Sequence, residues 1–291
     1  MPQETWRINC YFHGFCIFVY HCAPKISSRV FFVSRKLDWS FQIPAIRGDI
    51  PLLWNQFGNH MKRLMLGLIA WAVLNGPVSA QGAPVVVELY TSQGCSSCPP
   101  ADAMLHDLAQ LDGVIALALH VDYWDYIGWK DEFADPAHAK RQRSYAAVAG
   151  RRSVYTPQMI INGTSDIVGG RKAEVLDVIA RHAAVPPMVH LDVQRAGDVL
   201  TIKARLRGPA PGPMVVQMLR FQPMRKSRIT RGENAGKLLE YANIVQDLRI
   251  LTGWDGHDAF TFDTEITGDL PAVVLIQGAR MGPIFAAQVV R

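Results

Sequence analysis

Two cysteines, Cys95 and Cys98, are the residues best suited to chemistry in this chain of 291 residues. They follow a run of β-favouring residues from Val85 to Tyr90 and a short polar turn. Pro99 and Pro100 come directly after the pair and favour the first turn of a helix. The positive end of that helix would stabilise a thiolate on Cys95. The pattern predicts a redox pair in which Cys95 attacks and Cys98, deeper and less exposed, resolves.

A structural disulfide and a metal site are the two alternative uses of the pair. A disulfide that closes so short a loop contributes about 2 kcal/mol by the chain-entropy estimate, which makes it a poor structural link. A structural zinc site needs four protein ligands, and no second cysteine pair follows residue 80. A soft metal such as copper would suit Cys95, Cys98 and His120, although an ordinary hydrogen-bonded histidine is the favoured interpretation of His120. The redox interpretation requires no cofactor.

A targeting segment precedes the cysteines. Lys62 and Arg63 form a basic start, which leads into an apolar run of 11 residues and a small-residue cleavage motif that ends at Ala80. This pattern is typical of a secretory signal peptide over residues 61–80, and the run is shorter than the roughly 20 residues of a membrane span. We interpret residues 1–60 as a start assigned too early or a disordered extension. The expected location is therefore the periplasm or the outside of the cell, where a disulfide persists.

The charge balance changes once this leader is set aside. Residues 1–80 carry 8 of the 30 Lys and Arg residues and 3 of the 25 Asp and Glu residues, so 22 of each remain. The formal net charge of +5 thus belongs to the leader, and it gives no support to nucleic-acid or anionic-membrane binding. We expect no nucleic-acid partner and no membrane span in the mature chain.

Residues 83–184 alternate between strand and helix signals. A continuous apolar run favours a strand covered on both faces, and amphipathic spacing favours a helix packed on it. After the first strand and its helix, the expected elements are a strand over Val114–Val121, a helix over Ala137–Val148, a strand over Val154–Asn162 and a helix over Arg171–Ala183.

An aromatic loop follows the second strand. Its five aromatic residues are Tyr123, Trp124, Tyr126, Trp129 and Phe133. Asp122 and Trp124 are candidate substrate-binding residues that would line a groove beside Cys95. Aromatic side chains at this density also cap a core, and we favour that role slightly.

Together these features resemble the thioredoxin fold. They include the Cys-x-x-Cys turn, the Thr156–Pro157 step, the Asn162–Gly163 turn and the Gly169–Gly170 pair. In that family the proline matching Pro157 is cis and faces the thiol pair, which implies that Thr156 offers backbone groups to an extended substrate. More narrowly, VELYTSQGCSSCPPAD, HVDYWDYIGWKD, VYTPQMIING and RGENAG are similar to a family of secreted bacterial thioredoxin-like proteins catalogued as a domain of unknown function.

The resemblance has departures. Gly94 stands where thioredoxins carry a tryptophan, and two serines replace their Gly-Pro, so it implies no redox potential. Glu88 lies near the place of the buried acid that assists proton transfer in thioredoxin, but one residue further from the cysteine. We predict the same role for Glu88, and a glutamate that faces solvent or a basic partner is the alternative.

The pattern changes at Val185–Pro187, where two prolines mark a boundary between domains 83–184 and 188–291. The strands expected beyond it are Val189–Gln194, Val199–Leu206, Val215–Phe221, Leu238–Leu251, Ala259–Thr264, Ala272–Gln277 and Ile284–Val290. Short strands separated by Gly and Pro turns suggest a small β-sandwich. It contains no cysteine, and its RGENAG loop is expected to be a glycine-framed turn, with a contact site as the alternative.

The sequence thus predicts an α/β thioredoxin-like domain followed by a small all-β, sandwich-like domain. The predicted activity is that of a thiol–disulfide oxidoreductase acting on protein thiols and disulfides or on a small thiol, with an unknown redox partner. The predicted catalytic residues are Cys95, Cys98, Pro157 and Glu88, and the predicted substrate-binding residues are Thr156, Asp122 and Trp124. The alternative is a non-enzymatic copper carrier or adaptor.

Overall fold

The structure is a computed structural model that describes residues 83–291. The predictions made for residues 1–60 and for the signal peptide at 61–80 lie outside this range. Within it, every helix is too short or too polar to cross a lipid bilayer.

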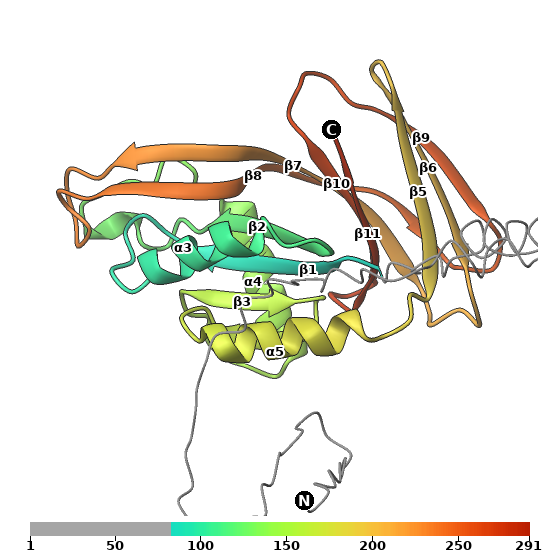
Figure 1. Cartoon of the computed structure of the whole chain (residues 1–291), viewed down its shortest axis with the longest axis horizontal. Helices are drawn as coiled ribbons and strands as arrows, with labels where there is room; N and C mark the ends of the chain where they lie inside the picture. Colours follow the sequence, from blue (N-terminus) through green and yellow to red (C-terminus); the bar gives the residue numbers. More distant parts are fainter. Residues whose placement is uncertain (1–82) are drawn as a thin grey trace, which may run out of the picture. The chain divides into compact units, whose positions relative to one another are not determined.

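The first half of the described chain has the predicted thioredoxin-like arrangement (Figure 1). Its elements are β1 (Val85–Thr91), α3 (Pro99–Leu108), β2 (Val114–His120), η1 (Asp125–Ile127), α4 (Pro136–Val148), β3 (Gln158–Ile161), β4 (Ser165–Val168) and α5 (Lys172–Ala183). β1 runs parallel to β2 and antiparallel to β3, which forms a hairpin with β4. β4 was not expected from the sequence, and β3 is shorter than the strand expected over Val154–Asn162.

Alternate residues of β1 face two different cores. Val85, Val87 and Leu89 pack with side chains of α3 and α5. Val86 and Tyr90 pack on the opposite face with side chains of α4. Because side chains alternate along a strand, all seven residues of β1 are buried between helices on both faces.

The second half is all-β, as predicted. Its strands are β5 (Val189–Ala196), β6 (Val199–Leu206), β7 (Met214–Arg228), β8 (Leu238–Trp254), β9 (Phe260–Glu265), β10 (Ala272–Gly278) and β11 (Ile284–Val290). β5, β6 and β9 form a separate antiparallel sheet. Its apolar side chains share a core with those of β7, β10 and β11, which gives the expected sandwich-like packing.

The larger sheet runs through both halves, in the order β11-β10-β7-β8-β2-β1-β3-β4. β8 joins β2 at the parallel pair Ala118 and Ile244, and Asn243 Nδ2 donates to Ala116 O at 2.8 Å. Hydrogen bonding is therefore continuous across the boundary predicted at Val185–Pro187.

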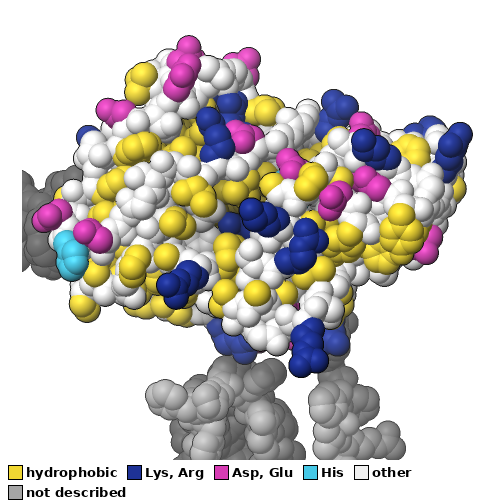
Figure 2. Space-filling model, turned by 180° about the vertical axis from the view of Figure 1, so that it is seen from behind, with side chains coloured by type: hydrophobic (Ala, Val, Ile, Leu, Met, Phe, Trp, Pro, Cys, Tyr) yellow, Lys and Arg dark blue, Asp and Glu magenta, His cyan; other side chains and the backbone are white. Residues whose placement is uncertain are grey.

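β7 and β8 are longer than expected and form a hairpin that extends over the thioredoxin-like half (Figure 1). Its tip, residues 229–237, is called the strap below. On the face shown in Figure 2, basic and acidic side chains of the described residues occur among apolar ones and form no continuous patch of one sign.

Candidate functional site

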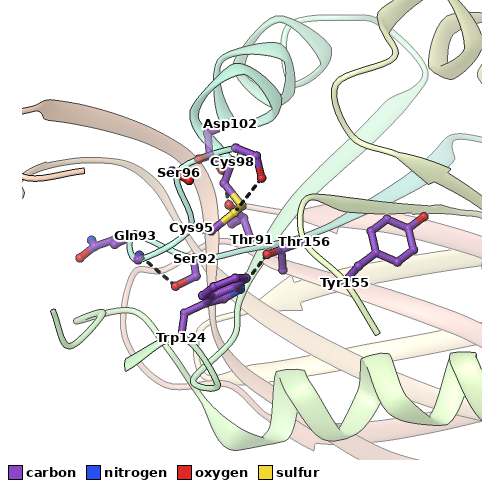
Figure 3. Close-up of a disulfide and its surroundings, with 12 residues drawn as sticks. Thr91, Ser92, Gln93, Cys95, Ser96, Cys98, Asp102, Trp124, Tyr155 and Thr156 are labelled. Atoms are coloured by element: carbon purple, nitrogen blue, oxygen red, sulfur yellow. Dashed lines mark hydrogen bonds between the residues drawn. A yellow bond between two sulfur atoms is a disulfide. The ribbon is translucent and has the colours of Figure 1, made fainter. Parts of the chain in front are cut away.

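Cys95 and Cys98 form a disulfide at the start of α3 (Figure 3). Cys98 is the N-cap residue, and its carbonyl accepts hydrogen bonds from the N–H groups of Ala101 and Asp102 at 2.8 and 3.1 Å. Cys95 lies in the turn before it, where its N–H donates to Ser92 O at 3.1 Å. The strand, the turn and the prolines thus place both sulfurs where the sequence predicts them.

The exposure of the pair differs from the prediction. Cys95 is 1% exposed and Cys98 is 0% exposed, so the sulfur predicted to attack is not open to solvent. The aromatic loop closes one side, because a Cβ added at Gly94 would lie 3.1 Å from Trp124 Cβ. The strap contacts the turn as well. The sulfurs are buried because segments distant in sequence cover the turn.

Thr156 lies beside the disulfide (Figure 3). The Thr156–Pro157 peptide bond is cis, as the resemblance implies. Trp124 Nε1 donates to Thr156 Oγ1 at 2.8 Å, so the aromatic loop and the Thr156 loop meet next to the sulfurs (Figure 3). Asp122 lies in the same loop and is half-buried, and no side-chain hydrogen bond joins it to these groups among residues 83–291.

Glu88 has a basic partner. It is 0% exposed, its Oε1 accepts from Arg141 Nε at 2.7 Å, and its Oε2 accepts from the Tyr145 hydroxyl at 2.7 Å. It shares the sheet face of Val86 and Tyr90, which α4 covers, whereas α3 and Cys98 lie on the other face. A step of one residue along a strand reverses the face. Of the roles left open by the sequence, the basic partner is the one the geometry shows.

Arg141 connects both halves of the protein. Its Nη1 donates to Gln217 Oε1 at 2.9 Å on β7, and its Nη2 donates to Gln277 Oε1 at 3.1 Å on β10. The side chain of Arg141 is 5% exposed, so the ion pair with Glu88 is a buried one that needs all of these partners.

Asp102 is the buried acid that the sequence analysis missed. It is 5% exposed, and its Oδ1 accepts from Thr91 Oγ1 at 2.7 Å. Burial raises its pKa from 3.8 to about 7, against the lowering effects of His120 and of the Thr91 hydrogen bond. The signal available in the sequence was its spacing of four residues from Cys98, which puts both on one face of the helix.

His120 belongs to a buried pair with Asp131. Its Nδ1 lies 2.8 Å from Asp131 Oδ2, and both side chains are 0% exposed. Although burial opposes it, His120 and the hydrogen bonds to Asp131 hold the pKa of that carboxyl below its ordinary value. Asp131 Oδ2 also accepts from Gln93 N at 2.8 Å, which fixes the turn before Cys95.

The alternative metal site is not assembled in this part of the chain. Within residues 83–291, no group of three or more His, Cys, Asp or Glu side chains is placed to hold a metal ion. His120 Nε2 and Asp102 Oδ2 have no hydrogen-bond partner among these residues, and the edge of the Tyr241 ring lies close to His120, with centroids 4.9 Å apart.

The strap contacts the cysteine turn directly. Asn234 is 0% exposed, and its Nδ2 donates to the carbonyl oxygens of Gln93 and Cys95, at 2.9 Å each. Glu233 Oε2 accepts from Ser96 N at 3.2 Å. The RGENAG segment is the expected turn, and it is also a contact site.

Comparisons with known proteins agree with this fold. A family model described as "Protein of unknown function (DUF1223)" matches residues 86–277. A crystal structure of a protein from Agrobacterium tumefaciens is similar at 30% identity and a TM-score of 0.61, covering 73% of this chain and 96% of that one. HBP35 of Porphyromonas gingivalis is similar in fold, at 14% identity and a TM-score of 0.50, covering 72% of this chain and 76% of that one. No curated protein matches the sequence.

Proposed function

The chain belongs to the DUF1223 family, whose function is unknown, and we propose that it is a thiol–disulfide oxidoreductase that works outside the cytoplasm. The observation that carries the proposal is the Cys95–Cys98 disulfide at the start of α3, with Thr156 beside it. The predicted signal peptide supports the location, because such a compartment maintains disulfides.

The proposed exchange has two steps. In the reduced protein, the Cys95 thiolate attacks one sulfur of a substrate disulfide, forms a mixed disulfide and releases the other substrate sulfur as a thiolate. Cys98 then loses its proton and attacks Cys95 Sγ, which restores the Cys95–Cys98 bond and releases the second substrate thiolate. The protein is oxidised and the substrate disulfide is reduced. The reverse sequence oxidises a substrate dithiol.

We assign Asp102 as the group that accepts the proton of Cys98 and later returns it. Its side chain lies near Cys98 in Figure 3, and its amide donates to the Cys98 carbonyl at 3.1 Å. Burial raises the pKa of Asp102 to about 7, which suits a group that both accepts and returns a proton near neutral pH. Glu88 has no part in this proposal because both of its oxygens are engaged on the other face of the sheet.

The substrate in this proposal carries a disulfide or thiols, on a protein or on a small molecule. Thr156 would align an extended substrate, and Trp124 would form one wall of its path to Cys95. Because Cys95 is 1% exposed, the substrate reaches it only after part of this cover has moved.

A second candidate is an adaptor with a structural disulfide. The burial of both sulfurs favours it, since structural disulfides are inaccessible and have potentials below about −300 mV.

Trapping separates the two candidates. The Cys98→Ser variant should accumulate mixed disulfides with its partners, because nothing resolves the bond to Cys95. The Cys95→Ser variant is the matched control and should trap few or none. Equilibration of the wild-type protein with glutathione buffers should also give a measurable potential for the couple. No trapped partner, together with a disulfide that stays oxidised in every buffer, would replace the oxidoreductase with the adaptor.

A further inference from the structure

Asn234 is the only buried residue between Thr230 and Lys237. Its amide group makes three of its four possible hydrogen bonds, because Nδ2 donates to Gln93 O and Cys95 O and Oδ1 accepts from Lys237 Nζ at 2.8 Å. A buried amide is costly without such partners. Asn234 therefore fastens the strap to the turn that holds Cys95.

The strap makes few other contacts with the site. A Cβ added at Gly232 would lie 3.2 Å from Trp129 Cβ, and Glu233 receives a single exposed hydrogen bond from Ser96 N. The aromatic loop is held more firmly, because buried Asp131 binds it to the turn and Trp124 bonds to Thr156. Within the strap only Ile229 and Asn234 are buried, and a hairpin tip with few buried contacts opens at low cost. Of the two covers over Cys95, the strap therefore has the fewer buried attachments.

Glu233 adds an electrostatic effect. Its carboxylate occupies the N–H of Ser96, next to Cys95 and in the turn that leads into α3. This is the positive end that would stabilise a Cys95 thiolate. A carboxylate there disfavours the thiolate. Moving Glu233 away together with the strap would therefore stabilise the thiolate form of Cys95.

We propose that the strap, residues 229–237, is a gate that determines which thiols and disulfides reach Cys95, with Asn234 as its latch. The purpose of such a gate rests on the proposed function, whereas its existence rests on the contacts alone. The closed strap protects the pair from unselective exchange.

The rate of reduction by dithiothreitol tests the gate. One thiolate of the reagent attacks Cys95 Sγ and breaks the bond to Cys98, which leaves as a thiolate and takes up a proton. The second thiolate of the reagent then closes its own cyclic disulfide and releases Cys95. Samples quenched with a maleimide and weighed by mass spectrometry give the rate.

The Asn234→Ala variant loses both latch hydrogen bonds and should be reduced roughly tenfold faster than the wild type, a factor equivalent to about 1.4 kcal/mol. Gln246→Ala is the matched control, because it removes an exposed side-chain hydrogen bond to Gln222 in the same hairpin, away from the tip. It should leave the rate unchanged. Equal rates for Asn234→Ala and the wild type would overturn the gate. The gate would also be overturned if the acceleration, converted to a free energy, did not exceed the variant's loss of unfolding free energy in urea. Global unfolding would then be sufficient to explain the faster reduction.

The Glu233→Gln variant tests the electrostatic effect through the pKa of Cys95, a quantity that a change in packing alone would not alter. The amide keeps an oxygen for Ser96 N and removes the charge, so the pKa of Cys95 in the reduced protein should fall, as seen in the pH profile of alkylation by iodoacetamide. An unchanged or raised pKa would refute the electrostatic part. Faster reduction of Asn234→Ala, with no partner trapped by Cys98→Ser and a disulfide that stays oxidised in every glutathione buffer, would keep the gate and reject the oxidoreductase. Trapped partners with no effect of Asn234→Ala would do the reverse.

Discussion

Replacing Asp102 with Asn should change the pH dependence of stability. Burial raises the pKa of Asp102 in the folded protein from 3.8 to about 7, so ionisation of this carboxyl favours the unfolded chain. Its contribution to stability is complete below about pH 4 and is lost as the pH rises through about 7. An asparagine keeps an oxygen for the Thr91 hydroxyl and never ionises.

The size of the effect follows from the two pKa values. Each pH unit at which the unfolded carboxyl is ionised and the folded one is not costs about 1.4 kcal/mol. Over the interval from about pH 5 to about pH 8, the wild type should therefore lose about 3 kcal/mol of unfolding free energy relative to Asp102→Asn. Urea titrations of the disulfide-bonded protein at both pH values measure the difference.

A control on the same helix isolates the cause. The carboxylate of Asp107 is exposed, and its hydrogen bond with Lys172 lowers its pKa, so Asp107→Asn should keep the pH slope of the wild type over this interval. Parallel pH profiles for the wild type and Asp102→Asn would mean that Asp102 is ionised at neutral pH. The assignment of the Cys98 proton to Asp102 would then be refuted.

Four further substitutions, two of them combined in one variant, test packing at the site and elsewhere in the fold. Arg141→Met leaves the buried carboxylate of Glu88 unpaired and should cost about 3–5 kcal/mol in urea titrations, and a loss under about 1 kcal/mol would contradict the buried ion pair. Trp124→Phe removes the hydrogen bond to Thr156 and should cost about 1 kcal/mol, with no further loss when Thr156→Val is added. Gly163→Ala places a Cβ at a φ of +72° and 2.7 Å from a backbone carbonyl oxygen, so its melting temperature should fall by more than that of an ordinary surface substitution.

The sequence predicts those parts of the site that depend on local signals. The β-favouring run before Cys95 and the prolines after Cys98 are sufficient to place the disulfide at the start of α3. Asp135 caps α4, since its side chain accepts from Ala137 N at 2.8 Å. Each of these features depends on residues only a few positions apart in the sequence. Strand and helix propensities can predict such features because they describe the same short stretches of sequence.

The features that were missed depend on distant segments. The side of the sheet on which Glu88 lies follows from which helix covers which face, and this cannot be read from its distance to Cys95. The cover over Cys95 comes partly from Asn234, 139 positions away. The strands of the two halves form one continuous sheet only because β8 pairs with β2. The polar second half of β7 hid its length, because an exposed hairpin arm has no apolar alternation.

The pairing of β2 with β8 has a consequence for any shortened form of the protein. Six of the seven residues of β2 are buried, and β8 covers the side of β2 that β1 leaves free. A fragment that stops at the prolines would present this apolar strand to other copies of itself, which is the usual beginning of aggregation. The C-terminal half therefore shields the thioredoxin-like half from self-association, and the two must be produced together.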